Sequence, residues 1–209
     1  PVEYSIPGVS QIEVDGFGKV TFSSALRSLL RHDPDVLMVG EVRDRETADM
    51  ALRAAVTGHL VFSTLHTNTA VGAVTRLVDM GCEPFMVAAT LQASISQRLV
   101  RRLCPTCKAP RAVTEADVPL LGDGAADTPV FEPRGCVRCQ RTGFLGRVGV
   151  FELFQVDEAA RQAISSGADE KAIARSARHL ITLREDAAAK VVAGLTTVDE
   201  VRRIVALEE

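Results

Sequence analysis

The chain has 209 residues, of which 46% are hydrophobic and 24% charged, and its formal net charge is -3. This composition is typical of a globular protein and excludes a disordered chain or a strongly basic nucleic-acid-binding protein. No apolar run approaches the ~18 residues that a transmembrane helix needs. The sequence begins at Pro1 without an initiator methionine or a signal peptide, so we expect it to be part of a longer polypeptide.

The first expected elements are a hairpin and a helix. Residues 11–14 and 20–22 carry short apolar runs on either side of a glycine-containing turn, which predicts two strands. A helical pattern then begins after Ser23 or Ser24, either of which can cap it, and ends before Pro34.

Two continuous apolar runs follow, Val36–Val39 and Leu60–Phe62, with a helical pattern between them. Such runs favour strands of a parallel sheet that is covered on both faces, and the order predicts a β-α-β unit. Further helices are expected over residues 70–80 and from residue 84 to about residue 103. We therefore assign residues 1–103 to an α/β domain.

The remainder of the chain has two different characters. Residues 104–147 contain four of the five cysteines and five prolines, a composition that does not support long regular elements. Residues 148–209 begin with a strand pattern and continue with helical patterns, in which Thr197 and Glu200 have the spacing of a capping box. We expect a cysteine-containing subdomain over 104–147 and a strand with a helical subdomain over 148–209.

The clustered cysteines form two C-x-x-C pairs, Cys104 with Cys107 and Cys136 with Cys139. Each pair can place two thiolates on one ion through a tight turn, and four sulfurs complete a tetrahedral zinc site with no open position. We therefore predict a structural zinc site rather than a catalytic one. The separation of the pairs is longer than in most zinc ribbons. Two alternatives stay open, namely reduced unpaired thiols and two disulfides, which are rare in reducing compartments.

Candidate catalytic residues follow the two apolar runs. Glu41 comes directly after the run that ends at Gly40, where parallel sheets present groups to ligands; the alternative is an acid that caps the next helix. His66 follows the second run and stands beside several hydroxyl side chains, so it is placed to contact a phosphate. A structural role is the alternative for His66 and the stronger expectation for His59, at the start of that run.

Arg27 and Arg31 lie one helical turn apart. Such arginines usually lie on a solvated face, yet they can also reach the phosphate of a neighbouring subunit in a multimeric ATPase.

The sequence has no G-x-x-x-x-G-K-[ST] loop, the Walker A element that wraps nucleotide phosphates. We therefore expect this stretch of chain by itself to bind nucleotide poorly and to be inactive.

A different class of function also fits part of the sequence. A zinc ribbon with basic residues around it could bind nucleic acid, although few aromatic residues are near for base stacking. The same residues could instead dock an acidic protein domain or anionic lipid. The basic residues are Arg98, Arg101, Arg102, Lys108, Arg111, Arg134, Arg138 and Arg141.

Several long motifs together resemble the secretion ATPases of type II secretion and type IV pilus assembly, over nearly the whole chain. The four-cysteine segment resembles the secretion and pilus-extension members of that family. The motifs are Pro1–Tyr4, Leu26–Asp35, Val39–Asp44, Thr57–Asn68 and Gln97–Cys104.

The resemblance implies a role for each matching residue. Glu3 matches the acid of the family's Asp box, Glu41 its Walker B glutamate, and His59 and His66 its His box. The two acids would orient or deprotonate the attacking water and hold the magnesium shell, and His66 would contact the terminal phosphate. The two arginines match those between these boxes and would stabilise the transferred charge.

The resemblance also implies the setting in which these residues act. The family forms homo-hexameric rings of RecA-like domains, so residues 1–103 would be part of a RecA-like core. ATP and magnesium would be used by the intact protein and zinc would be structural. The expected partners are an inner-membrane platform and cytoplasmic adaptor proteins, with no specific nucleic acid. The protein would be cytoplasmic and peripheral on the inner membrane of a bacterium, and would drive pilus or pseudopilus assembly and protein secretion across the outer membrane.

Overall fold

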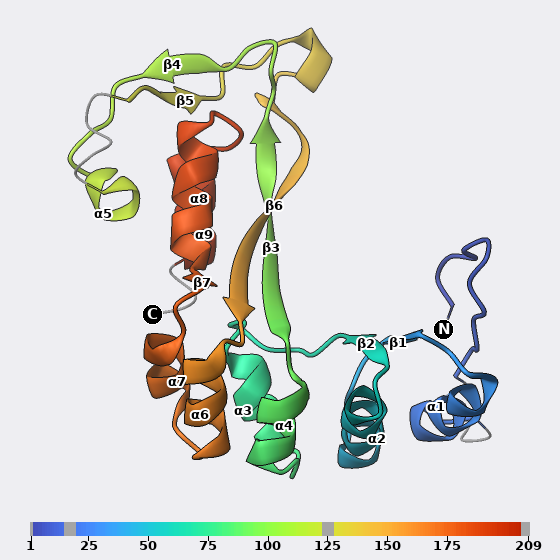
Figure 1. Cartoon of the computed structure of the whole chain (residues 1–209). Helices are drawn as coiled ribbons and strands as arrows, with labels where there is room; N and C mark the ends of the chain where they lie inside the picture. The colour runs from blue at the N-terminus through green and yellow to red at the C-terminus, as the bar shows by residue number, and fades with distance from the viewer. Residues whose placement is uncertain (1, 15–19, 123–127, 206–209) are drawn as a thin grey trace. The chain divides into compact units, whose positions relative to one another are not determined.

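The computed structural model describes residues 2–14, 20–122 and 128–205, and the chain divides into two compact units (Figure 1). The first unit contains Pro1–Thr67, Val71–Gln92 and Val156–Ser176. The second contains Asn68–Ala70, Ala93–Gln155 and Ala177–Glu209. The expected subdomain 104–147 thus lies within the second unit, whereas the expected segment 148–209 is divided between both.

The first unit contains the parallel strands, the described helices that precede residue 93 and two later helices. The expected β-α-β unit is confirmed, with both strands parallel and in register from the Val36–Leu60 pair to the Val39–Ser63 pair. Its elements are α1 (Phe22–Leu29), the 3-10 turn η1 (Leu30–His32), β1 (Val36–Val39), α2 (Arg45–Val56), β2 (Leu60–Ser63), α3 (Gly72–Asp79), α4 (Pro84–Thr90), α6 (Glu158–Ser165) and α7 (Glu170–Ser176).

The expected hairpin is wrong for the residues that the structure describes. Residues 11–14 and 20–21 are not strands, and the turn itself lies outside the described residues. Helix α1 begins already at Phe22 because Thr21, and not Ser23 or Ser24, is its cap. The backbone N–H of Ser24 donates to Thr21 Oγ1 at 3.1 Å, which satisfies one of the free donors at the helix start.

The β1–β2 sheet has one covered face, whereas its apolar runs predicted two. Leu37 and Val39 are buried, but Val36 and Met38 are exposed. Side chains alternate between the two faces of a strand, so the described residues cover only one face of β1. Helix α2 packs on the neighbouring strand β2.

The second unit is built on a long antiparallel sheet. Strands β3 and β6 pair over most of their length, and β7 adds to β6. Helices α8 and α9 pack against this sheet around a core that contains Val100, Val150, Leu183, Val191 and Val201. The elements are β3 (Ala93–Leu103), β4 (Ala109–Arg111), α5 (Val118–Leu121), β5 (Val130–Glu132), the 3-10 turn η3 (Val137–Cys139), β6 (Phe144–Gln155), β7 (Leu180–Ile181), α8 (Leu183–Val192) and α9 (Val198–Val205).

The helix expected from residue 84 to about residue 103 ends at Thr90, and β3 takes its place from Ala93. Only the pairing with β6, which follows about forty residues later, makes the extended form favourable, so a local pattern could not identify it. The described residues therefore form an α/β architecture with one parallel and two antiparallel sheets. No helix among the described residues is long and apolar enough to cross a membrane.

Candidate active site and candidate metal centre

The carboxyl ends of β1 and β2 lie at the same edge of their sheet because the two strands are parallel and in register. The contacts continue past the strands. Val42 N–H donates to Thr64 O at 3.0 Å, and Thr64 Oγ1 donates to Gly40 O at 2.6 Å. These bonds fix the two segments that carry Glu41 and His66 against each other.

Three side chains come together at this edge. Glu41 Oε2 lies 2.6 Å from Arg43 Nε and 3.7 Å from His66 Nε2. The Glu41 side chain is 22% exposed, whereas that of His66 is 85% exposed and open to a ligand. Glu41 and His66 are both candidates from the sequence, which gave Arg43 no role. Arg43 could have been found from its spacing, because residues two apart, such as Glu41 and Arg43, lie on the same side of an extended backbone.

His59 lies at the other end of β2 and contacts the end of α2. Its Nδ1 is 2.9 Å from Ala54 O and 3.1 Å from Thr57 Oγ1. A carbonyl oxygen only accepts, so Nδ1 carries the proton and donates to Ala54. The geometry gives His59 a structural contact at the C-terminus of α2, and a catalytic role for it stays a prediction.

The other candidate residues are not joined to Glu41 by any contact that the structure describes. Arg27 is exposed and lies 3.5 Å from Glu46 Oε1. The side chains of Glu3 and Arg31 are exposed and make no hydrogen bond or ion pair with the rest of the described chain. Their roles stay predictions.

The second unit brings the four predicted cysteine ligands together. The sulfur atoms of Cys104, Cys107, Cys136 and Cys139 all lie within 4.8 Å of one another. The closest pairs are 3.8 to 3.9 Å apart, too long for disulfides. A tetrahedral ion with zinc–sulfur bonds of about 2.3 Å separates its ligands by about 3.8 Å. The group could therefore hold a metal ion.

Backbone donors support the second pair of this cluster. The N–H groups of Cys136 and Gly143 each donate to Cys139 Sγ at 3.2 Å. Burial of Cys139 disfavours its thiolate, but these two donors together with side-chain hydrogen bonds from Cys107 and Cys136 lower its pKa to about 6. Gly143 has a φ of 76°, and a Cβ there would lie 2.3 Å from Pro133 Cβ. Glycine is required at this turn because no side chain fits.

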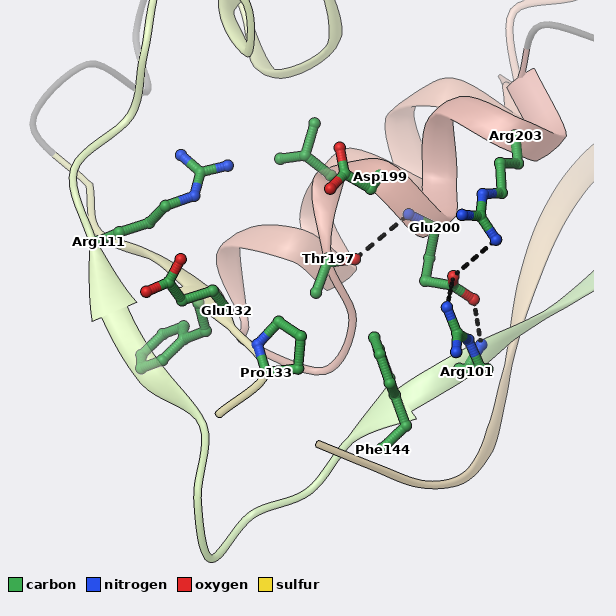
Figure 2. A pocket seen from close by; sticks show the side chains of 11 residues that line it. Arg101, Arg111, Glu132, Pro133, Phe144, Thr197, Asp199, Glu200 and Arg203 are labelled. Carbon is green, nitrogen blue, oxygen red and sulfur yellow. Dashed lines mark hydrogen bonds and ion pairs between the residues drawn. The ribbon is translucent and has the colours of Figure 1, made fainter. Parts of the chain in front are cut away.

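A cavity of about 370 Å³ lies elsewhere in the second unit, between β3, the β4–β5 sheet and the start of α9 (Figure 2). The acids and arginines that line it are engaged with one another or with nearby residues. Glu200 accepts from the backbone N–H of Arg101 at 3.1 Å and from its guanidinium at 2.6 Å. The hydrogen bond from the Arg101 guanidinium lowers the pKa of the Glu200 carboxyl. Thr197 Oγ1 accepts from Glu200 N–H at 3.2 Å, which confirms one half of the expected capping box. The other half is not formed, because the Glu200 carboxyl pairs with Arg101.

Replacing Glu200 with alanine is expected to lower the free energy of unfolding by about 2 kcal/mol, because a buried carboxylate and its bonds to β3 are lost. Asp199→Asn is the control. Its carboxyl is exposed and lies 3.7 Å from Arg202, so the loss should stay below about 1 kcal/mol. Urea unfolding of both variants measures the difference. Equal effects would show that the Glu200 network does not stabilise the unit.

Comparisons with known proteins identify the family. The family model for type II/IV secretion system proteins matches residues 1–203. Type II secretion system protein E of Aeromonas hydrophila is 50% identical over 98% of this chain and 41% of its own length. The type IV pilus assembly ATPase PilB of Thermus thermophilus is 47% identical over 96% of this chain and 23% of its own length. The chain thus spans about two fifths of the first of these relatives and less of the second.

Solved structures agree with this comparison. The pilus retraction motor PilT with bound ADP has a TM-score of 0.61 at 30% identity, over 88% of this chain and 43% of PilT. The ATPase DotB of Legionella pneumophila shares the fold, with a TM-score of 0.60 at 24% identity over 89% of this chain and 42% of DotB. The chain belongs to the type II/IV secretion system protein family.

Proposed function

We propose that the intact polypeptide hydrolyses ATP to ADP and phosphate and uses the energy to drive protein secretion or pilus assembly. The observation that carries this proposal is the approach of Glu41 and His66, 3.7 Å apart, at the carboxyl edge of the β1–β2 sheet. Relatives whose names include ATPase support it, among them the type II secretion system ATPase E of Vibrio cholerae, 46% identical over 98% of this chain.

Each residue of this edge has a distinct task in the proposed reaction. Glu41 orients the attacking water and accepts its proton as the bond between the γ-phosphorus and the bridging oxygen breaks. His66, exposed beside it, donates to an oxygen of the terminal phosphate. Arg43 holds one oxygen of Glu41 and so orients the carboxylate. Magnesium, when bound with the nucleotide, neutralises charge on the phosphates.

The remaining assignments belong to the same proposal. The first unit is part of a RecA-like core that acts in a homo-hexamer, with Glu3 near the magnesium shell. Arg27 and Arg31, both exposed on the segment that follows Thr21, reach a nucleotide from a neighbouring subunit. The protein works at the cytoplasmic side of a bacterial inner membrane with platform and adaptor proteins. The four-cysteine cluster holds a structural zinc ion.

The test is phosphate release by the full-length protein with magnesium and ATP. His66→Ala is expected to lower kcat by about 10- to 100-fold, since one donor to the developing phosphate charge is lost. His179→Ala removes an exposed imidazole from the second unit and is the matched control, expected to leave kcat unchanged. If the full-length protein releases no phosphate, or if both variants behave alike, the proposal is wrong.

A further inference from the structure

The turn that joins α8 to α9, residues 193–197, is closed by two backbone hydrogen bonds at the end of α8. Leu195 N–H donates to Lys190 O at 3.0 Å, and Gly194 N–H donates to Val191 O at 2.9 Å. Gly194 has a φ of 65°, as is common for the residue that ends a helix in this way. The carbonyl oxygen of Gly194 takes part in neither bond, so it can accept from another part of the second unit.

The donor to this oxygen is Lys108, which directly follows Cys107. Its Nζ lies 2.7 Å from Gly194 O and 4.5 Å from the centre of the Phe131 ring. The half-buried ammonium thus meets the C-terminal end of α8, where the helix dipole favours a cation. No carboxylate that the structure describes pairs with it. A Cβ at Gly194 would lie 2.8 Å from Lys108 Nζ, so the glycine is what allows this approach.

The backbone of Lys108 is part of the first cysteine turn. Its N–H donates to Cys104 O at 3.1 Å, and Cys107 N–H donates to the same oxygen at 3.3 Å. These bonds close the turn that brings the sulfurs of both cysteines into the cluster. The conformation of the cysteine turn therefore sets where the Lys108 side chain starts. If this turn opens, the ammonium is withdrawn from Gly194.

The end of β3 supplies two other contacts of the α8–α9 turn. Leu103 N–H donates to Leu195 O, and Thr196 Oγ1 donates to Arg101 O, each at 2.9 Å. These two bonds start from the strand, whereas the bond of Lys108 starts from the cysteine turn. The two kinds of contact can therefore be removed separately.

We propose that Lys108 couples the four-cysteine site to the α8–α9 turn, so that zinc binding and closure of this turn favour each other. The proposal rests on the zinc site that is part of the proposed function. When the four sulfurs hold zinc, the first cysteine turn is fixed and the ammonium stays on Gly194. Coupling between two equilibria is reciprocal, so a loosened α8–α9 turn weakens zinc binding. The turn leads into Thr197 and Val198, which line the cavity of Figure 2, so metal binding also reaches this wall of the cavity.

Zinc affinity of the full-length protein, measured by competition with a chromophoric chelator under reducing conditions, is the first readout. Lys108→Met keeps most of the aliphatic chain but removes the ammonium, and is expected to weaken zinc binding by about 5- to 10-fold. Lys190→Met is the matched control and should keep the wild-type affinity. The Lys190 ammonium also lies over a phenylalanine ring, that of Phe151, but its ion-pair partner is Asp186. Equal affinities of the wild type and Lys108→Met would overturn the proposal.

The reciprocal direction is tested from the α8–α9 turn. Thr196→Val removes the bond to Arg101 O at a fully buried side chain. It is expected to weaken zinc binding by about 3-fold in the wild-type background and by less than about 1.5-fold in Lys108→Met, because the connection is already missing there. Equal effects in the two backgrounds would overturn the proposal, since the turn would then act on the cysteines by another route.

Hydrogen exchange at the turn reports the coupling independently of the affinity. Chelation of zinc should quicken exchange of the Gly194 and Leu195 amides by about 10-fold in the wild type and in Lys190→Met. In Lys108→Met these amides should already exchange faster, and chelation should change their exchange by less than about 2-fold. The same response to chelation in all three proteins would overturn the proposal. A wild-type protein that binds no zinc would refute the zinc site and the coupling with it, whereas zinc bound equally well by Lys108→Met would refute the coupling alone.

Discussion

Replacing Glu41 with glutamine in the full-length protein is expected to lower kcat for ATP hydrolysis by about 10²- to 10⁴-fold, the usual contribution of a positioned general base. Glutamine has nearly the same shape and can still hold a water molecule, but it does not accept a proton at neutral pH. The KM for ATP should change little, because the carboxylate acts on water and not on the base or ribose. Steady-state phosphate release at saturating magnesium and ATP measures the effect.

The matched control is Glu83→Gln, which removes the same charge from the same unit. Glu83 precedes α4, is exposed and makes no side-chain bond to the helix that follows it. It should keep full activity. Arg43→Ala gives an intermediate expectation, since Glu41 loses the cation 2.6 Å from Oε2 but keeps its proton-accepting oxygens. Activity retained in Glu41→Gln would refute the assignment of the base.

The meeting of Glu41 and His66 could be predicted from sequence because it depends on local patterns and one general rule. Two apolar runs with a helix between them become neighbouring parallel strands, and parallel strands end at the same edge. Residues just after the two runs must then approach each other. The same reasoning missed Arg43, because an arginine between Glu41 and a helix cap is as easily a solvated side chain as an ion-pair partner.

Features that depend on partners distant in sequence could not be predicted. Residues 93–103 contain good helix formers, and only the β6 ladder makes them a strand. The hydrogen bond from Ala70 N–H to Glu152 joins residues 82 positions apart. Similarly, Glu200 has capping-box spacing after Thr197, yet its carboxyl bonds to Arg101, 99 positions away. A charged guanidinium offers the carboxylate a stronger bond than a neutral N–H does.

The four cysteines were predictable as a group because a C-x-x-C pair carries its geometry in its own spacing. How far the fold of the second unit depends on these cysteines could not be predicted from the sequence. The hydrophobic core of the second unit, which includes Val130, Val150 and Val191, contains none of these cysteines. The structure therefore separates the part of this unit around the two cysteine pairs from a core that has its own apolar packing.

Replacing Cys139 with serine is accordingly expected to abolish binding of about one zinc ion per chain and to unfold the segment around the cysteines, while the α8–α9 core persists. Cys139 is buried and receives two backbone N–H bonds, so a serine hydroxyl is a poor substitute for its thiolate. Structural zinc contributes on the order of 10 kcal/mol to the folding of isolated metal-binding peptides, more than these short elements can supply without it. Metal content measured under reducing conditions, and hydrogen exchange of residues 104–108 and 133–143, report the two effects.

Cys82→Ser is the control, because Cys82 is buried in the first unit and is not part of the cluster. It should cost some stability but keep the zinc. A Cys139→Ser protein that retains zinc and normal exchange would refute the four-cysteine site, since three thiolates and a hydroxyl bind the ion much more weakly than four thiolates.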